Sequence, residues 1–271
     1  MKVDLSIVIV TYNSAGHVSR LLDSIYKDKG KINLEVIVVD NQSTDNSLAV
    51  AKGHKLKPLC IQTGSNAGFS IAVNKGFSNA KGDYFFILNP DTVVLKGTLK
   101  KLLDFCKDTS PLGAVVPRLL NLDGKPQASV YKFQTIGNAI KKNFFNCRDC
   151  FGKYLPDNHV QKVEVAVMAA FLVPATTFDI IGGLDERYFL YYEDFEFCRQ
   201  LSLHNLPVYY LPTAKIKHIH GASGHFVFHL KSPLLASARL YYGVLYSDVL
   251  NFVLWVGHKW QVILRRQRFR D

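Results

Sequence analysis

The sequence predicts an α/β fold with a mostly parallel central sheet, flanked by helices and followed by a C-terminal helical extension. Short continuous apolar runs alternate with helix-like segments through the first half of the chain. These runs lack in–out alternation, which is typical of strands buried on both faces of a parallel sheet. Acidic residues follow two of the runs, at the strand ends where open α/β sheets bind ligands.

The first half is predicted to repeat strand and helix in strict order. Apolar residues at positions 18, 21, 22 and 25 have the spacing of one helix face, whereas the runs before and after them are continuous. We predict strands at residues 5–10, 34–39, 58–62 and 84–88, and helices at 18–26, 47–52, 67–80 and 98–107.

The organisation changes near residues 115–117. Residues 121–160 are irregular and rich in Lys, Asn and aromatic residues. After them we predict a strand at 163–173, a turn at 182–185, a helix from 193 to 204, and short strands at 208–211 and 215–219. Residues 234–270 have a helical pattern that ends in an arginine cluster, Arg265, Arg266, Arg268 and Arg270. One domain with a C-terminal extension fits this order.

The composition is that of a globular protein with an unusual charge. Hydrophobic residues make up 48% and charged residues 20% of 271 residues, and the net charge is +11. Such a charge attracts polyanions, an anionic membrane surface or a phosphorylated substrate. The charge is spread along the chain and no RNA-binding or helix-turn-helix pattern accompanies it, so we expect no nucleic-acid partner. The apolar stretch 241–257 contains Asp248 and Asn251 and falls short of a membrane span of about 20 residues.

The cysteines and the amino terminus both favour a cytoplasmic location. Five scattered cysteines suit a reducing compartment, and the first apolar run is too short for a secretory signal. Cys147 and Cys150 form a lone CxxC pattern. Because a zinc site needs four ligands, we predict two free thiols there.

Polar side chains follow the first two predicted strands. Thr11, Asn13 and Asp40 would suit a nucleoside, but the glycine-rich pattern of a dinucleotide fold is absent, with only Gly16 after the first strand. A nicotinamide cofactor is therefore not expected. We favour a helix cap or an Asx turn for Asp45 over ligand contact.

The segment Asn89-Pro90-Asp91 delivers a carboxylate at the end of a buried strand. Pro90 stiffens the turn, and a rigid carboxylate is a ligand that hard divalent cations prefer. The alternative is an ordinary turn with a solvated acid.

Asn66 and Gly68 open the predicted helix 67–80. Gly68 permits a close backbone approach, and Asn66 could cap the helix. The residues alone do not choose between ligand contact and simple capping.

Glu193 and Asp194 begin a predicted helix. Because helix amino termini favour anions, both carboxylates are expected to stay ionised near neutral pH, where one could act as a general base. The alternative is an ordinary acidic first turn. His218 and His220 follow a short strand, and one of them could complete a metal site with Asp91.

Taken in order, these segments resemble the inverting nucleotide-sugar glycosyltransferases of family 2 with the GT-A fold, and in particular bacterial rhamnosyltransferases of cell-surface polysaccharide synthesis. The resemblance rests on residues 6–13, 38–45, 66–69, 88–91, 183–186 and 192–194, and on His218 with Gly221 and Ser223. It covers residues 5 to about 223. The chain departs from the family's D-x-D pattern at Asn89, a neutral side chain.

The resemblance implies a role for each candidate residue. Thr11, Asn13 and Asp40 would hold the nucleoside, and Asn66, Gly68 and Asn89 would complete the nucleotide-sugar site. Asp91 and His218 would bind a divalent metal, Mg²⁺ or Mn²⁺, with His220 matching less well. Asp194 would be the general base and Glu193 a supporting group. One base and a diphosphate leaving group suit an inverting transferase, whereas a glycoside hydrolase needs two flanking carboxyls.

The resemblance also implies substrates, partners and a domain division. The first expected donor is dTDP-rhamnose, with UDP-galactose, UDP-glucose or UDP-N-acetylglucosamine as alternatives, and the acceptor is a lipid-linked or oligosaccharide hydroxyl in O-antigen, capsule or cell-wall synthesis. Residues 1–117 would bind the nucleotide sugar and 118–230 would hold the acceptor. Residues 231–271 mix Tyr, Trp and Leu with the terminal arginines, so they would rest on the anionic inner face of the cytoplasmic membrane. The alternatives are a homo-oligomer interface or a packed core with a solvated basic tail. The alternative from another class is a catalytically inactive sugar-nucleotide or polyanion binder.

Overall fold

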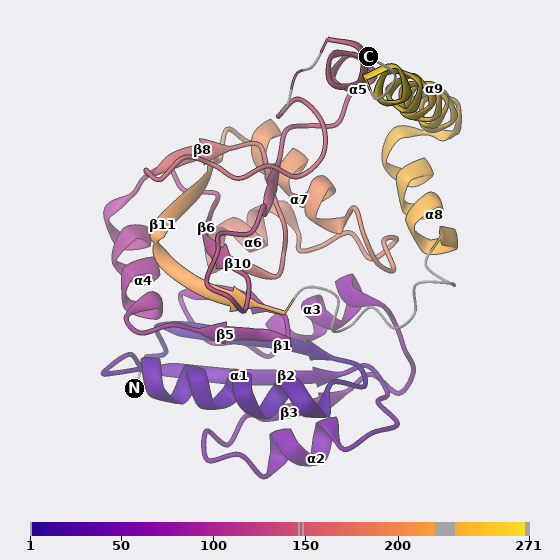
Figure 1. The fold of residues 1–271 in the computed structure, drawn as a ribbon. Helices are drawn as coiled ribbons and strands as arrows, with labels where there is room; N and C mark the ends of the chain where they lie inside the picture. Colours follow the sequence, from indigo (N-terminus) through magenta and orange to yellow (C-terminus); the bar gives the residue numbers. More distant parts are fainter. Residues whose placement is uncertain (1, 146, 148, 220–230, 269–271) are drawn as a thin grey trace.

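The computed structural model describes residues 2–145, 147, 149–219 and 231–268, apart from the side chains of 231–232 and 263–268 (Figure 1). Within these residues nine strands form one sheet in the order β3-β2-β1-β4-β10-β6-β11-β5, with β8 beside β11. The strands are β1 (Leu5–Thr11), β2 (Leu34–Asp40), β3 (Leu59–Gln62), β4 (Tyr84–Leu88), β5 (Thr92–Val94), β6 (Ala114–Leu120), β8 (Gln161–Val163), β10 (Ala170–Pro174) and β11 (Val208–His218). The predicted α/β fold is confirmed.

Helices cover both faces of this sheet, as the continuous apolar strands require. One buried cluster joins the sheet to α1 (Ala15–Asp28), α2 (Ser47–Lys52) and α4 (Thr98–Asp108). A second cluster on the opposite face joins it to α3 (Phe69–Phe77), α6 (Ala175–Ile181) and α7 (Glu193–Leu203). Leu5, Ile7 and Ile9 of β1 belong to the first cluster and Val8 to the second, so the strand is buried on both sides.

The strand directions place several strand ends at one edge of the sheet. The strands β1, β2, β3 and β4 are mutually parallel. The strand β10 runs antiparallel to β4 and to β6, and β11 runs parallel to β6. The carboxyl ends of β1, β2, β4, β6 and β11 therefore lie at the same edge, although they come from distant parts of the sequence.

The second half contains more elements than the sequence predicts. The single strand predicted at 163–173 is divided into β8, β9 (Val165–Ala166) and β10, and β9 pairs with β7 (Val130–Tyr131) in a separate small sheet. Two short strands predicted at 208–219 are one strand, β11, with an irregularity between Leu211 and Lys215. The segment predicted as irregular contains the helix α5 (Ile136–Phe144), whose first turn is capped by the Thr135 hydroxyl accepting from the Asn138 N–H at 3.1 Å.

The C-terminal extension is two helices, α8 (Lys231–Tyr242) and α9 (Val244–Arg268), separated at Gly243, which has φ 80°. The helix α9 packs against α5: Gly257 lies so close to Asn143 that an added Cβ would be 2.4 Å from the Asn143 Cγ. Figure 1 shows α8 and α9 standing outside the sheet and its covering helices. Among the described helices none is both long and apolar enough to cross a bilayer. The side chains of the predicted arginine cluster lie outside the described residues.

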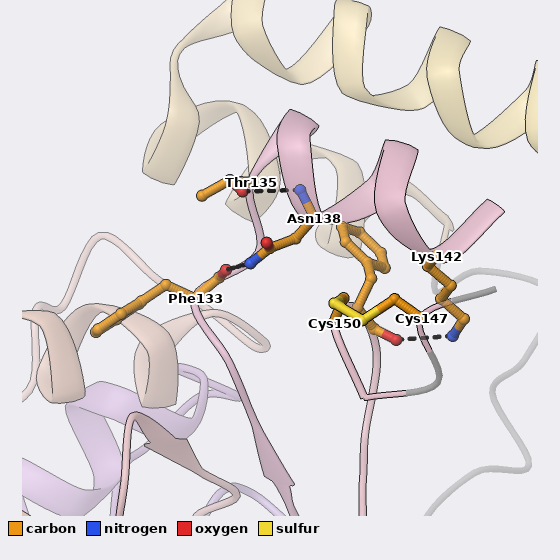
Figure 2. The surroundings of a disulfide bond; sticks show 7 residues. Phe133, Thr135, Asn138, Lys142, Cys147 and Cys150 are labelled. Carbon is orange, nitrogen blue, oxygen red and sulfur yellow. Dashed lines mark hydrogen bonds between the residues drawn. A yellow bond between two sulfur atoms is a disulfide. The ribbon is translucent and has the colours of Figure 1, made fainter. Parts of the chain in front are cut away.

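The prediction of two free thiols in the CxxC segment is wrong. Cys147 and Cys150 are joined by a disulfide beside α5 (Figure 2). The turn brings their Cα atoms to 5.7 Å, a separation typical of disulfides, and Lys142 Nζ donates to the Phe151 carbonyl next to it at 2.7 Å. This pair of cysteines therefore does not support the expected reducing compartment.

Candidate active site

Thr11 and Asp40 lie side by side at the carboxyl ends of β1 and β2. They are partners in the β1–β2 register and are 0% and 1% exposed. Asp40 Oδ2 accepts the Ser43 N–H at 3.1 Å. Among the described residues, Asp40 Oδ1 and the Thr11 hydroxyl have no hydrogen-bond partner. Because buried polar groups are seldom left unsatisfied, this pair marks a place where a polar ligand would be stabilised.

Asn13 and Asp45 hold the loops after β1 and β2 together. Asn13 has φ 50°, a left-handed conformation that asparagine tolerates better than most residues, and its Oδ1 accepts the Thr44 N–H at 2.8 Å. Asp45 accepts the Ser47 N–H at 2.9 Å and the Ala15 N–H at 3.0 Å. The Asx turn predicted for Asp45 is confirmed, and both side chains shape the loops around Thr11 and Asp40.

The close backbone approach expected at Gly68 is made by the protein itself. Gly68 has φ 91°, and a Cβ there would lie 2.6 Å from the Phe189 carbonyl oxygen. That oxygen accepts the Phe69 N–H at 2.7 Å, while the Asn41 amide donates to the Gly68 carbonyl at 2.9 Å. Of the two alternatives left open for Asn66, simple helix capping is not what the structure shows: α3 begins at Phe69 with Gly68 as its cap residue, and Asn66 Oδ1 accepts the Gly68 N–H at 3.4 Å.

The structure brings Asp91 and His218 together. Asp91 follows β4 and is 2% exposed, and His218 ends β11. Antiparallel pairing of β5 with β11 sets His218 opposite Thr92, and the Ile219 N–H donates to the Asp91 carbonyl at 3.0 Å. The His218 Nε2 atom lies 3.5 Å from Asp91 Oδ1. Two residues far apart in sequence thus present an imidazole and a carboxylate to each other.

Among the described residues, Gln127 is hydrogen-bonded to His218, and Asn89 lies in the same turn as Asp91. His218 Nδ1 makes a 2.8 Å hydrogen bond with Gln127 Oε1. The Asn89 backbone is used by the turn, since its N–H donates to the Ala169 carbonyl at 2.9 Å and its own carbonyl accepts the Thr92 hydroxyl at 2.7 Å. The Asn89 side chain carries no charge, so Asp91 supplies the negative charge of this turn.

The donor set of Asp91 and His218 fits a divalent cation. Neighbouring ligands of an octahedral ion at about 2.1 Å lie about 3 Å apart, close to the observed 3.5 Å. No group of three or more His, Cys, Asp or Glu side chains suitable for a metal occurs in the described part of the chain. A cation held here would therefore need water or substrate oxygens as further ligands, which is how Mg²⁺ is usually bound beside phosphates.

Glu193 and Asp194 open α7 from a strained turn. Tyr191 and Tyr192 have φ 70° and 65°, left-handed values that are costly for bulky residues and that concentrate at functional sites. Asp194 Oδ1 accepts the Phe195 N–H at 2.9 Å. Within the described residues, Glu193 Oε2 has no hydrogen-bond partner.

The prediction that both carboxylates stay ionised near neutral pH is wrong for Glu193. Burial raises the pKa of Glu193, and the neighbouring Asp194 charge raises it further. Burial also raises the pKa of Asp194, but the Phe195 N–H and the Lys153 charge oppose that rise. The pair therefore holds its proton on Glu193 and leaves Asp194 as the carboxylate near neutral pH, because desolvation outweighs the helix terminus at the more deeply buried group.

A short segment links the two groups of candidate residues. Gln127 contacts His218, and four positions later the Tyr131 ring lies 4.9 Å from the Phe195 ring, next to Asp194. Four extended residues span at most about 14 Å. The segment 127–131 thus contacts both His218 and the residue that follows Asp194.

Sequence reasoning missed several residues that build this site. Asn74 of α3 holds the turn before α7: its amide donates to the Leu184 carbonyl at 2.8 Å, and its Oδ1 accepts the Leu184 N–H at 2.9 Å. An asparagine within a predicted helix gave no signal of this pairing. Gln127 and Phe189 were also missed, because the residues that they contact, His218 and Phe69, are distant from them in sequence. His220, Gly221 and Ser223, named in the sequence analysis, lie outside the described residues.

The chain is similar in sequence to known proteins. A family model described as glycosyl transferase family 2 matches residues 6–157. An N-acetylglucosaminyl-diphospho-decaprenol L-rhamnosyltransferase of Mycobacterium tuberculosis is 26% identical over 79% of this chain and 75% of its own length. A dTDP-rhamnosyl transferase, RfbF, of Shigella flexneri is 24% identical over 90% of this chain and 78% of its own length.

Solved structures show the same fold at low identity. GalNAc-T7 with UDP, GalNAc and Mn²⁺ aligns with a TM-score of 0.63 and 14% identity over 81% of this chain, which spans only 43% of that structure. TarS 1–349 of S. aureus in complex with UDP aligns with a TM-score of 0.59 and 17% identity over 93% of this chain and 69% of that structure. The GT-A fold expected from the sequence is confirmed by these similarities.

Proposed function

The chain belongs to glycosyl transferase family 2, and from that premise we propose that it is a metal-dependent inverting enzyme that moves a sugar from a nucleotide diphosphate to an acceptor hydroxyl. The observation that carries the proposal is the 3.5 Å approach of His218 Nε2 to Asp91 Oδ1 at the sheet edge that also holds Thr11 and Asp40. A buried nucleoside site next to a cation site is what a nucleotide-diphosphate substrate requires.

In the proposed mechanism the nucleoside is bound by the Thr11 hydroxyl and Asp40 Oδ1, which have no hydrogen-bond partner in the described part of the chain. A divalent cation held by Asp91 and His218 would offset the charge of the diphosphate leaving group. The Asp194 carboxylate accepts the proton of the acceptor hydroxyl as that oxygen bonds to the anomeric carbon, while the carbon–diphosphate bond breaks on the opposite face. Inversion at that carbon follows from a single in-line displacement.

We propose dTDP-rhamnose as the donor and a lipid-linked saccharide as the acceptor, in O-antigen, capsule or cell-wall synthesis. The names of the M. tuberculosis and S. flexneri relatives support this choice, and the UDP complexes of structural neighbours support a UDP-sugar as the second candidate. Residues 1–117 would bind the donor and 118–230 would hold the acceptor, where Lys153 adds positive charge close to Asp194.

A nucleotide panel tests this proposal directly. At 100 times its dissociation constant a ligand stabilises the folded state by about 2.7 kcal/mol, which for a chain of this size raises Tm by about 5 °C. We expect dTDP with Mg²⁺ or Mn²⁺ to raise Tm in this way and UDP to raise it less, and we expect dTDP-rhamnose to be turned over. A larger shift with UDP would select the second donor. Binding without turnover of any nucleotide sugar would instead identify an inactive sugar-nucleotide binder.

We propose that the exposed side of α9 binds the anionic inner face of the cytoplasmic membrane. We call this side of α9 the membrane surface. The outward residues of α9 are large and apolar, with Leu245 79%, Phe252 62% and Trp255 59% exposed. Lys259 Nζ lies 6.0 Å from the centre of the Trp255 ring, and an aromatic belt with basic residues is typical of interfacial helices. A lipid-linked acceptor would be reached from such a position.

The substitution Phe252→Glu tests the membrane surface. Losing the burial of one phenylalanine costs about 1.5 kcal/mol, so we expect at least about tenfold weaker co-sedimentation with vesicles containing anionic phospholipid. The control is Leu59→Glu, which makes the same kind of change at an exposed apolar residue of the edge strand β3 and should bind like the unaltered chain. Equal binding of all three proteins would refute the surface, and a concentration-dependent change in mass would identify a homo-oligomer interface instead.

A further inference from the structure

Two side-chain amides, of Asn121 and Gln127, are hydrogen-bonded in series to His218. The Gln127 amide nitrogen Nε2 donates to Asn121 Oδ1 at 3.1 Å, and Gln127 Oε1 lies 2.8 Å from His218 Nδ1. An amide oxygen can only accept a hydrogen bond, and a side-chain amide nitrogen can only donate one. Since Asn121 Oδ1 accepts from the nitrogen of Gln127, the oxygen of Gln127 is directed at the imidazole.

This orientation determines which imidazole nitrogen carries the proton. Because Gln127 Oε1 is an acceptor, His218 Nδ1 must be the protonated nitrogen. In the neutral ring the other nitrogen, Nε2, is then the unprotonated one, and an unprotonated imidazole nitrogen is the kind of atom that coordinates a metal. That atom faces Asp91 Oδ1 at 3.5 Å. A cation placed between these two acceptor atoms would be attracted by both of them.

Gln127 and Asn121 are themselves fixed by the backbone. The Gln127 N–H donates to the Leu119 carbonyl at 2.8 Å, and the Asn121 N–H donates to the Lys125 carbonyl at 2.8 Å across a tight turn. Leu119 belongs to β6, which pairs with β11 in parallel. The backbone of Gln127 is therefore tied to β6, the strand next to His218, and Asn121 directly follows that strand.

We propose that Gln127 is a positioning residue that holds His218 in the Nδ1–H tautomer and directs Nε2 toward Asp91, so that the two side chains can share one divalent cation. Residues that bond the second nitrogen of a metal-binding histidine typically contribute 10–100-fold to metal affinity. The metal part of this inference rests on the proposed function, whereas the tautomer can be measured without metal or substrate.

The first experiment measures the tautomer. In metal-free protein carrying ¹⁵N-histidine, the His218 signals are assigned by their absence from His218→Gln. We expect a protonated Nδ1 and an unprotonated Nε2 at pH 8 in the unaltered chain, and a mixture of both tautomers in Gln127→Leu, which keeps the size but loses the acceptor. Gln127→Glu retains an acceptor oxygen and should restore the single tautomer. A protonated Nε2 in the unaltered protein would overturn the proposal.

The second experiment measures Mn²⁺ affinity by electron paramagnetic resonance with dTDP present, and with UDP if dTDP does not bind. We expect Gln127→Leu to weaken Mn²⁺ binding at least tenfold and Gln127→Glu to stay within about threefold of the unaltered chain. An unchanged affinity in Gln127→Leu contradicts the positioning role. If the unaltered chain binds neither Mn²⁺ nor nucleotide, the proposed function fails, and the tautomer result alone then decides the role of Gln127.

Discussion

Replacing Asp194 by asparagine is expected to lower kcat by about 10³-fold while leaving the nucleotide dissociation constant within about twofold. General-base catalysis is worth about 10²–10⁴-fold, and an amide cannot accept the acceptor's proton. The nucleoside atoms are expected to bind at Thr11 and Asp40, on other strands, so donor affinity should survive. The measurements are steady-state rates with saturating donor and a calorimetric titration of the nucleotide.

Glu193→Gln is the matched control, because it makes the same carboxyl-to-amide change one residue away. Burial and the Asp194 charge raise the pKa of Glu193, so the native side chain is already neutral near pH 7 and the amide imitates it. We expect less than a tenfold loss of kcat. If Glu193→Gln were as inactive as Asp194→Asn, Asp194 could not be assigned as the general base with Glu193 as a merely supporting group.

The pH dependence of the rate follows from the same carboxylates. Burial raises the pKa of Asp194 to about 6, and only the ionised form can take up a proton. The rate kcat/KM should therefore fall as the pH drops below about 6 and reach a plateau above it. Glu193→Gln should keep this acid limb, and a limb near pH 4 would show that Asp194 is more exposed to water in solution than in this structure.

The strands of the first half were predictable because their residues carry the signal themselves. Continuous apolar runs at β1, β2 and β4 are buried on both faces, and a polar residue ends or follows each run at the carboxyl edge of the sheet. The candidate residues Thr11, Asp40 and Asp91 were found in this way. Short elements such as β7 and β9 were not, since two-residue strands exist only through pairing with each other.

The raised pKa of Glu193, the neighbour of the candidate base, was not predictable from local sequence. A helix amino terminus stabilises carboxylates, and that was the only influence visible in residues 191–196. Burial by distant aromatic residues becomes visible only after folding: the Tyr192 ring lies 5.5 Å from that of Tyr241 in α8. The same holds for Gln127, whose contact with His218 depends on how β6 pairs with β11.

Replacing Asp91 by asparagine is expected to abolish metal-dependent transfer, with a loss of about 10³-fold at saturating nucleotide sugar. The turn Asn89-Pro90-Asp91 would then carry no negative charge, and His218 would be left facing a neutral amide. A divalent cation prefers anionic oxygen ligands, and its charge stabilisation of the leaving group is worth several kcal/mol. Initial rates across a series of Mg²⁺ and Mn²⁺ concentrations measure this loss.

Asn89→Asp is the informative counterpart, because it adds a carboxylate at the other end of the same turn. The Asn89 contacts that hold the turn are made by its backbone, so an aspartate should be accommodated without rearrangement. If the neutral side chain limits metal binding, the added charge should tighten Mn²⁺ binding about tenfold. The double variant Asn89→Asp/Asp91→Asn should recover only part of the Mn²⁺ affinity that Asp91→Asn loses, since the new carboxylate is not the one that faces His218. Full recovery in the double variant would mean that the charge of the turn matters and the Asp91–His218 geometry does not. Unchanged metal dependence in Asp91→Asn would remove this turn from the metal site altogether.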